Sequence, residues 1–506
     1  RETFVQTLQL KSLLLSENRK ITESVLKSSD TSLLRLYRTW QELRKQITRE
    51  YARPLVQRQK DISLIEEQAE SLQKKISSLS SGLAKTVTAD QHLIAKMQQN
   101  LQEDEAIIEF IYFGVFREKA DSGLYAAFVL RKDSKAPVFV PLCERKELQK
   151  IFDSAGKSAT QMVSRLYRGS EIKNKSAAIV LGQQLYQLVW APLEKHLSGI
   201  KKINYSPANK LFQIAFHALP ADSNTLLMDR YTLHQYISTR ILADSGHTYV
   251  SKTGSITLFG DPSFDLDSTA LVRSAGNNKE YVAQPLPVDR GAGNGSWIRL
   301  PGTAEEVKKI KNLFEKNQVT AASFTKEKAT EENLKSLSGH SPRILHIATH
   351  GFFLPGPEKT ETGINNREAN VYSVSEDPLL RSGIVLAGGN RVWEGGNPID
   401  GVEDGIATAL EISQLDLSNT ELVVLSACET ALGDIRGNEG VFGLQRAFKM
   451  AGVKKMIMSL WQVPDKETAE LMTAFYSFWL KGKAVNEAFA LAQAEMRKKY
   501  SPYYWA

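Results

Sequence analysis

Residues 421–434, with the sequence ELVVLSACETALGD, contain the feature that decides the fold. The run 422–426 is rich in Val and Leu and is too short for an independent helix, which is typical of a strand buried on both faces of a sheet. In open α/β sheets, ligands bind just beyond the carboxyl ends of parallel strands. Cys428 follows such a strand end, so its thiol is a candidate nucleophile.

Strands and helices alternate on both sides of this stretch, through residues 254–506. Strands are expected at 255–259, 343–349, 382–387, 422–426 and 455–460, and helices at 303–314, 330–337, 405–412, 441–451, 466–481 and 484–499. We expect Thr303 to be an N-cap, because Glu306 follows three residues later as in a capping box. Helices of this length between strands predict a mostly parallel sheet with helices on both faces.

An earlier α/β unit is expected at residues 105–250. Its strands are expected at 106–113, 124–131, 137–142 and 231–237, and its helices at 144–154 and 176–197. Residues 202–205 and 211–219, joined by a turn, are expected to form a further hairpin. Cys143 has no base near it in sequence and is interpreted as a small buried hydrophobic residue. His217 and His234 also lack a partner thiol and are interpreted as structural.

Residues 1–104 are expected to be helical and nearly free of strands. Apolar residues recur at heptad spacing in one segment: Ile62, Ile65, Ala69, Leu72, Ile76 and Leu79. This seam predicts one arm of an antiparallel coiled-coil hairpin, and residues 33–51 are expected to form the other arm. A packing seam explains the pattern, and a docking arm for a partner protein is the functional alternative.

Composition excludes several classes of protein. The 506 residues carry a formal charge of +7, with Lys and Arg scattered among Glu and Asp, which favours a solvated surface over specific nucleic-acid binding. Two cysteines are too few for a disulfide framework, so we expect a reducing compartment such as the cytoplasm. No apolar run approaches the length of a membrane span. No cluster of residues has the spacing of metal ligands, and no cofactor is expected.

The candidate base for Cys428 should come from the end of a neighbouring parallel strand. His346 and His350 lie four residues apart on the expected strand 343–349 and its end. His346 lies inside the apolar run, which favours a hydrogen-bonded core histidine. His350 follows the strand and precedes Gly351, whose backbone N–H can face an oxyanion. A Cys–His pair works because the imidazole favours the nucleophilic thiolate and then protonates the leaving amine.

Several ordered blocks of sequence resemble the CHAT domain family, which comprises caspase- and separase-like cysteine peptidases often attached to tetratricopeptide repeats. The blocks are LFQIAFHALP (211–220), GDPSF (260–264), LPGTAEEVKKI (300–310), THG (349–351), LSACETALGD (425–434) and GNEGVFGLQRAFKMAGVKKMIMSLWQVPD (437–465). The resemblance implies a caspase-like fold with a pseudo-protease half at 105–250 and an active half at 254–506. The repeats common in the family do not occur in these residues.

The resemblance also implies the site residues. His350 and Cys428 would form the catalytic dyad, and the backbone N–H groups of Gly351 and Cys428 would form the oxyanion hole. Asp465 is a candidate floor of the pocket for a basic side chain at the cleaved position, as an acidic residue serves in separases; its structural alternative is the N-cap of the following helix. Trp461, beside the expected cleft, and Glu429, next to the nucleophile, are further candidates for substrate binding. For Glu429, a carboxylate at a helix start is the alternative.

The sequence leaves two classes of function open. The first is a cysteine endopeptidase that cleaves protein substrates through a thioester and is regulated by a protein partner or an upstream repeat region. A variant of it is a switchable protease that stays silent until a partner moves the helical hairpin or residues 355–378. The family's use in bacterial defence favours such regulation by analogy. The alternative is a catalytically silent caspase-like scaffold that binds proteins. Labelling of Cys428 by a peptide-based electrophile distinguishes the two.

Overall fold

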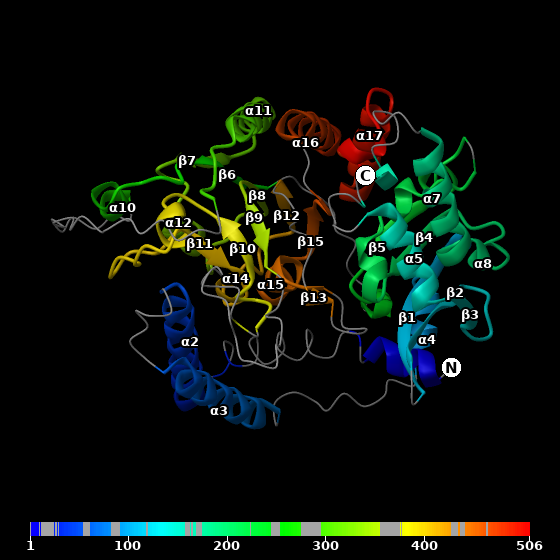
Figure 1. Ribbon diagram of the computed structural model, residues 1–506, viewed down its shortest axis with the longest axis horizontal. Helices are drawn as coiled ribbons and strands as arrows, with labels where there is room; N and C mark the ends of the chain where they lie inside the picture. The colour runs from blue at the N-terminus through cyan, green and yellow to red at the C-terminus, as the bar shows by residue number, and fades with distance from the viewer. Residues whose placement is uncertain are drawn as a thin grey trace.

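The computed structural model describes two α/β bodies that lie side by side, with a helical hairpin against the second (Figure 1). The described residues are 2–9, 11, 25, 28, 30–53, 61–81, 92–117, 120–156, 162, 165–167, 175–222, 224–243, 254–274, 295–354, 375, 377–426, 434–435, 441–461 and 464–506. Within these ranges, no helix combines the length and apolar character needed to cross a bilayer.

The first body is built on a mixed sheet of five strands in the order β3-β2-β1-β4-β5. The strands are β1 (Glu105–Arg117), β2 (Ala120–Arg131), β3 (Val138–Glu144), β4 (Lys202–Ser206) and β5 (Thr232–Gln235). β1, β2 and β3 are antiparallel, whereas β1, β4 and β5 run parallel. Ile108 and Phe110 of β1 enter one apolar cluster, and Ile107 and Ile111 enter another. Alternate residues of the strand therefore face two covered sides.

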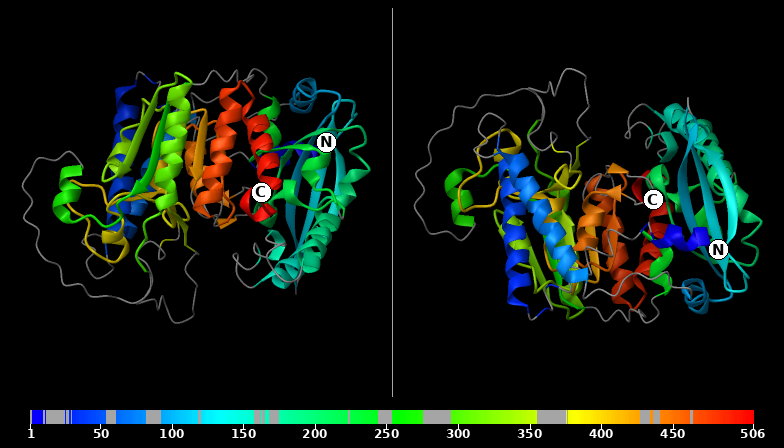
Figure 2. Two further views of the ribbon diagram at one scale, coloured as in Figure 1. Left: turned by 90° about the horizontal axis from the view of Figure 1, so that it is seen from above. Right: turned by 90° about the horizontal axis from the view of Figure 1, so that it is seen from below.

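Helices and short turns cover both faces of this sheet (Figure 2). One face packs against α5 (Arg145–Ala155), α7 (Lys175–Val189) and α8 (Ala191–Glu194). The other packs against helical residues 2–9, α4 (Leu93–Gln99) and the 3-10 helix η4 (Thr239–Ala243). The connection from β4 to β5 contains η2 (Asn209–Gln213), η3 (Phe216–Ala218) and α9 (Leu227–Arg230).

The second body is built on a five-stranded sheet in the order β15-β12-β8-β6-β7. All of its strands run parallel. They are β6 (Ile256–Pro262), β7 (Ala321–Lys326), β8 (Ile344–Ala348), β12 (Leu422–Ser426) and β15 (Lys455–Met458). β6 and β8 are buried along their whole length, as expected for central strands of a sheet covered on both faces.

Helices cover both faces of this second sheet. Loops and small sheets follow the carboxyl ends of its strands. One face packs against α11 (Pro301–Lys316), α16 (Asp465–Leu480) and α17 (Val485–Arg497). The other packs against α12 (Glu331–Lys335), α14 (Ala409–Ile412) and α15 (Leu444–Met450). The remaining elements are α10 (Ser268–Ser274), β9 (Gly351–Phe353), β10 (Ser382–Val385), α13 (Asn390–Trp393), β11 (Ile406–Thr408), β13 (Asp434–Ile435), β14 (Val441–Phe442) and η5 (Pro502–Tyr504). Strands β9, β10 and β11 form a small antiparallel sheet.

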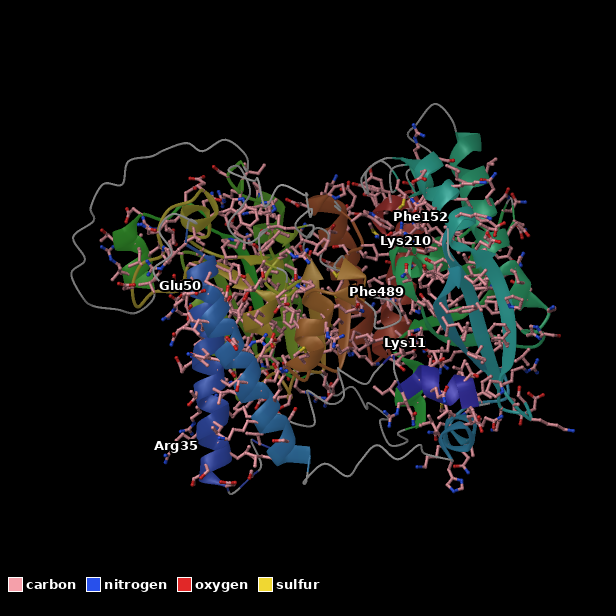
Figure 3. The ribbon with its side chains drawn as sticks, turned by 60° about the horizontal axis from the view of Figure 1, so that its bottom comes forward. Lys11, Arg35, Glu50, Phe152, Lys210 and Phe489 are labelled. Carbon is pink, nitrogen blue, oxygen red and sulfur yellow. The ribbon has the colours of Figure 1, made fainter. Side chains whose placement is uncertain are left out.

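The predicted helical hairpin is present as α2 (Thr31–Tyr51) and α3 (Ile62–Ser81). Its near end joins the core under the second sheet through Ile47 and Ile65. Figure 3 shows Glu50 at this near end and Arg35 towards the far end. Leu79 is 51% exposed although it belongs to the predicted seam, so the far end of the seam is only partly covered.

The two bodies meet through aromatic stacking and an ion pair. The ring of Tyr167, from the first body, stacks on Trp461 at a centroid distance of 4.6 Å. The indole Nε1 of Trp461 donates to the carbonyl oxygen of Tyr503 at 2.9 Å. Arg497 of α17 forms an ion pair with Asp229 of α9. Figure 2 shows α17 between the two sheets, so the carboxyl-terminal elements connect the bodies.

The predicted α/β fold with a parallel sheet between helices is confirmed, but several local predictions are wrong. Residues 406–408 of the helix expected at 405–412 form β11, and residues 441–442 of the helix expected at 441–451 form β14. Residues 211–219 form η2 and η3 instead of a hairpin arm, because β4 already has β1 and β5 as its two neighbours. Thr303 is not an N-cap, since α11 begins at Pro301 after the N-cap Leu300. The hydroxyl of Thr303 instead donates to the Leu300 carbonyl at 2.7 Å and accepts from the backbone N–H of Asp261 at 2.9 Å.

Candidate active site

The register of two central strands relates the two predicted catalytic positions. β8 and β12 pair in parallel, and Ala348 is the partner of Ser426 in the last pair. His350 and Cys428 therefore both follow that pair by two residues in the sequence. Neighbouring strands lie about 5 Å apart, so equal offsets from a paired position favour proximity. Cys428 and Glu429 themselves lie outside the described residues.

His350 is held by a backbone carbonyl on one side and by aromatic rings. Its Nε2 lies 2.7 Å from the carbonyl oxygen of Ile298. Because a carbonyl can only accept, Nε2 carries the proton and Nδ1 is the basic nitrogen of the neutral ring. The ring contacts Phe264 and Trp297 at centroid distances of 5.3 and 4.9 Å. Burial lowers the pKa of His350, while the Ile298 carbonyl and the charge of Asp465 act in the opposite direction. The imidazole is thus suited to act as a base near neutral pH.

The Ile298 carbonyl is positioned by contacts on both sides of it. Arg299 donates from Nε and Nη2 to both oxygens of Asp261 at 2.6 and 2.7 Å. Asp261 is buried at the end of β6 and has a φ of 49°, which few residues other than glycine adopt. On the other side, Asn390 accepts from the backbone N–H of Trp297 at 2.8 Å and donates to its carbonyl at 3.0 Å. These bonds hold residues 297–299 over His350.

Gly351 begins β9 directly after His350 and is buried. It is the partner of Ile384 in the pairing of β9 with β10. The carbonyl of His350 accepts from the backbone N–H of Val385 at 2.9 Å. The backbone at His350 and Gly351 is therefore tied to the small sheet, which restricts the direction of their peptide groups.

Asp465 lies near His350 but is not the N-cap of its helix. It is the first residue of α16, after the N-cap Pro464. Its carboxylate accepts a hydrogen bond from the backbone N–H of Gly302, which lowers its pKa, as does the charge of His350. Burial and the nearby Glu306 outweigh both and raise the pKa of Asp465. A Cβ on residue 302 would lie 2.2 Å from the Cβ of Asp465, so glycine is needed for this close approach.

Trp461 occupies a different environment from the one expected of a substrate-binding residue. It is 4% exposed and stacks between Tyr167 and Tyr503 at the junction of the two bodies. A buried, hydrogen-bonded indole is typical of a core residue. The structure therefore favours a packing role for Trp461.

A buried polar network beneath this site was missed by sequence reasoning. Glu306 of α11 is 1% exposed, and its Oε2 accepts from the hydroxyl of Ser426 at 3.0 Å. Its Oε1 lies 3.2 Å from Nε2 of His346, an ion-pair distance without full hydrogen-bond geometry. Nδ1 of His346 lies 3.2 Å from the hydroxyl of Tyr476. The pattern Thr-x-x-Glu at 303–306 has the spacing of a capping box, and that spacing does not indicate that the carboxylate of Glu306 is buried.

A cluster of three carboxylates elsewhere in the second body could hold a cation, but a lysine already neutralises part of its charge. Glu331, Glu403 and Glu411 bring carboxylate oxygens within 4.8 Å of one another. The Nζ of Lys335 lies 2.7, 2.9 and 2.9 Å from these three carboxylates. Burial, with neighbouring carboxylates, raises the pKa of Asp404 to about 7. The ammonium group takes the central place, so the cluster is a structural ion-pair network that joins α12 to α14.

Comparisons with known proteins identify relatives of much greater length. Tetratricopeptide repeat protein 28 of Mus musculus is 25% identical over 348 residues, which are 64% of this chain and 13% of that protein. The Homo sapiens protein of the same name is 25% identical over 336 residues, 64% of this chain and 12% of that protein. The chain thus spans only a small part of the length of these curated relatives.

Among the solved structures that match are two of the Saccharomyces cerevisiae separase–securin complex, at 3.0 and 2.6 Å resolution. They are 10% and 11% identical, both with a TM-score of 0.39, and the matches cover 81% and 80% of this chain and 30% of the other chain. That similarity is too low to transfer any feature of the complex. The CHAT domain profile, however, matches residues 180–506, which are more than half of the sequence. The chain therefore belongs to the CHAT domain family.

Proposed function

We propose that this chain is a cysteine endopeptidase in which Cys428 is the nucleophile and His350 is the base. The observation that carries the proposal is the pairing of β8 with β12, which gives the two residues the same offset from the pair Ala348–Ser426. The hydrogen bond from His350 to the Ile298 carbonyl supports it, because it leaves Nδ1 as the basic nitrogen. A Cys–His dyad requires an imidazole close to the thiol, with an unprotonated nitrogen that can accept the thiol proton.

The proposed reaction has two steps. The imidazole of His350 accepts the thiol proton, and the Cys428 thiolate attacks the scissile carbonyl carbon. Backbone N–H groups of Gly351 and Cys428 stabilise the negative charge that develops on the carbonyl oxygen. His350 then protonates the leaving amine, and water, activated by the same imidazole, hydrolyses the thioester and restores the thiol. Each step uses only the chain, the substrate and water.

We propose that Asp465 binds a basic side chain at the cleaved position. Its carboxylate is partly exposed, and its pKa responds to the charge of His350, which supports a place beside the dyad. A carboxylate pairs well with a guanidinium through charge-assisted hydrogen bonds. We propose that Glu429, next to the nucleophile, orients the adjacent backbone. Trp461 is left out of the pocket because it is buried.

The alternative is a silent scaffold that binds proteins, and the helical hairpin supports partner binding in either case. Leu64 and Leu79 of α3 are 53% and 51% exposed, although Ile65, Ala69 and Ile76 of the same helix are buried. We propose that a partner protein or a repeat region contacts this hairpin and regulates cleavage. Both curated relatives are named as tetratricopeptide repeat proteins, which supports a repeat region as that regulator. A free thiol nucleophile also suits a reducing location such as the cytoplasm.

The proposal is tested by sequencing the new amino termini that appear when the protein is added to a cell extract. We expect cleavage products with the intact chain and none with Cys428→Ala. Cys143→Ser is the matched control, because Cys143 is buried and its pKa is raised to about 12 by burial, so this variant should cut normally.

Two further outcomes separate the alternatives. If Asp465 binds the basic side chain, Asp465→Asn should weaken the preference for Arg and Lys while cleavage at other residues continues. Cleavage that is equal in the intact chain and in Cys428→Ala would contradict the peptidase assignment. Absence of cleavage and of electrophile labelling, with partner capture unaffected by Cys428→Ala, would favour the scaffold.

A further inference from the structure

The strongest unassigned feature is the buried carboxylate of Glu306, which contacts both strands that lead to the dyad. From α11 it reaches Ser426 at the end of β12 and His346 in the middle of β8. Glu306 is 1% exposed and His346 is fully buried. Burying a charged carboxylate costs free energy unless hydrogen bonds or ion pairs with its neighbours offset the lost hydration.

The hydrogen-bond directions around Glu306 are determined by the chemistry of its partners. Burial and the charge of Glu306 raise the pKa of Tyr476 well above its usual value, so the phenol keeps its proton. A protonated phenol can either donate or accept, so the tautomer of His346 is set by the carboxylate beside it, which can only accept. Nε2 of His346, 3.2 Å from Oε1 of Glu306, therefore carries the proton of the neutral ring, and Nδ1 accepts from the Tyr476 hydroxyl 3.2 Å away. Ser426 donates to Oε2 in full hydrogen-bond geometry, whereas His346 faces Oε1 at ion-pair distance only.

The two strand contacts lie at fixed short distances in sequence from the dyad. His346 precedes His350 by four residues, and Ser426 precedes Cys428 by two. Because the carboxylate is rigidly carried by α11, its two contacts restrict the sliding of β8 against β12. The charge of Glu306 also acts on Asp465, so the same residue influences the proposed substrate pocket. A displacement of about 1 Å between reacting groups can lower a rate about 100-fold.

We propose that Glu306 is a positioning residue that holds the ends of β8 and β12, and hence His350 and Cys428, in their reactive arrangement. This inference rests on the proposed function. Glu306 contacts Ser426 and His346 and acts through them. A role limited to stability would change unfolding without changing the turnover of the folded protein.

The test compares three variants. Glu306→Gln keeps the shape but leaves one acceptor oxygen instead of two, so one of the two partners faces an amide donor. Ser426→Ala removes one donor and keeps the inference testable if Glu306→Gln does not fold. Glu305→Gln is the matched control on the same helix, because the Glu305 side chain is 63% exposed and pairs only with Lys309 across 3.5 Å in the described contacts.

The first measurement is the rate at which iodoacetamide alkylates Cys428, followed by mass spectrometry. The chain has two cysteines, and Cys143 is buried, so the signal at Cys428 is unambiguous. We expect about a 10-fold slower rate in Glu306→Gln and about a 3-fold slower rate in Ser426→Ala, since the thiolate depends on a well-placed imidazole. Glu305→Gln should equal the intact chain. Equal rates in Glu306→Gln, Ser426→Ala and the intact chain would overturn the inference.

The second measurement separates this inference from the proposed function. If His350→Ala leaves the alkylation rate unchanged, the dyad itself is wrong and the positioning role fails with it. If His350→Ala slows alkylation but Glu306→Gln does not, only the role of Glu306 is wrong. With a peptide substrate, we expect Glu306→Gln to lower kcat about 10-fold and to change KM less than about 3-fold, because positioning affects the reacting groups more than binding. A change confined to KM would contradict the inference.

Discussion

The two α/β bodies differ in the side chains that lie at the carboxyl ends of their parallel strands. In the first body, Glu109 of β1 is the partner of Ser206, the last residue of β4. Lys11 fills this position, with its Nζ 2.7 Å from Glu109, 2.9 Å from the Phe110 carbonyl and 3.2 Å from the Ser206 carbonyl. Figure 3 shows Lys11 against the sheet of the first body. Both side chains of the ion pair are fully buried.

In the second body, the corresponding end of β8 carries a partly exposed imidazole instead of a buried ion pair. His350 follows the strand, and a polar network lies below it rather than across its end. The histidines of the first body differ in environment: burial lowers the pKa of His217 and of His234 to about 4. The comparison shows that similar strands become a packed junction or a candidate site according to which side chains occupy their ends.

The largest expected effect tests which body carries the activity. We expect His350→Ala to lower kcat/KM for a peptide about 1,000-fold or more, which is about 4 kcal/mol of transition-state stabilisation. His217→Gln in the first body should leave kcat/KM within about 2-fold, because it removes no group that contacts the proposed substrate. Steady-state kinetics on the purified variants measures both. An equal loss of kcat/KM in His350→Ala and His217→Gln would contradict the assignment of the activity to the second body.

The next effect tests the ion pair that closes the first body. We expect Lys11→Met to lower the free energy of unfolding by about 3–5 kcal/mol, because Glu109 would remain buried without its cation. Urea denaturation measures the change. The double variant Lys11→Met with Glu109→Gln should recover most of the loss, since no charge is left buried. If Lys11→Met unfolds at the same urea concentration as the intact chain, the packed junction is not a stabilising feature.

A smaller effect tests the support of His350 in the second body. Arg299→Ala removes the bidentate contact to Asp261 and loosens the Ile298 carbonyl over the imidazole. We expect kcat to fall about 10-fold, less than for His350 itself, because Asn390 still holds Trp297. Arg273→Ala, at an exposed position of α10, is the matched control and should keep the full kcat. A loss of equal size in the control would show that positive charge alone matters.

The smallest expected effect is on the free energy of unfolding at low pH, and it depends on His217 in the first body. Between about pH 7.5 and 5.5 the unfolded chain protonates His217, with a pKa near 6.5, whereas the folded chain does not until about pH 4. The unfolded state therefore binds more protons, and stability falls as the pH falls. We expect His217→Gln to reduce this loss by about 1 kcal/mol over that range. Urea denaturation at both pH values measures the loss, and an unchanged loss would contradict the neutral state of His217 in the folded chain.

Apolar runs and strand ends were predictable from the sequence because they are local features. The strands 343–349 and 422–426 were expected from short Val-, Ile- and Leu-rich runs, and they appear as β8 and β12. His350 was singled out because it follows such a run and precedes glycine. Asp465 was expected as a pocket residue or a cap, and the structure places it beside Gly302 at the start of α16.

Other features depended on contacts between distant segments. Tyr167 stacks on Trp461 from 294 positions away in the sequence, and no local pattern indicates that pair. Glu306 follows Thr303 in the spacing of a capping box, and that spacing is the same whether the carboxylate caps a helix or is buried. Only the packing of α11 on the sheet placed it next to His346 and Ser426.

The sequence by itself determined the parallel sheet of the second body, the helical hairpin and the candidate pair His350 and Cys428, because periodicity and motif order are written along the chain. The tertiary structure decided the register of β8 and β12, the carbonyl that fixes the tautomer of His350, and the buried carboxylate beneath both strands. It also decided that Lys11 fills the strand ends of the first body. These depend on which surfaces meet after folding, and a charge can be buried only where the folded chain supplies its partners.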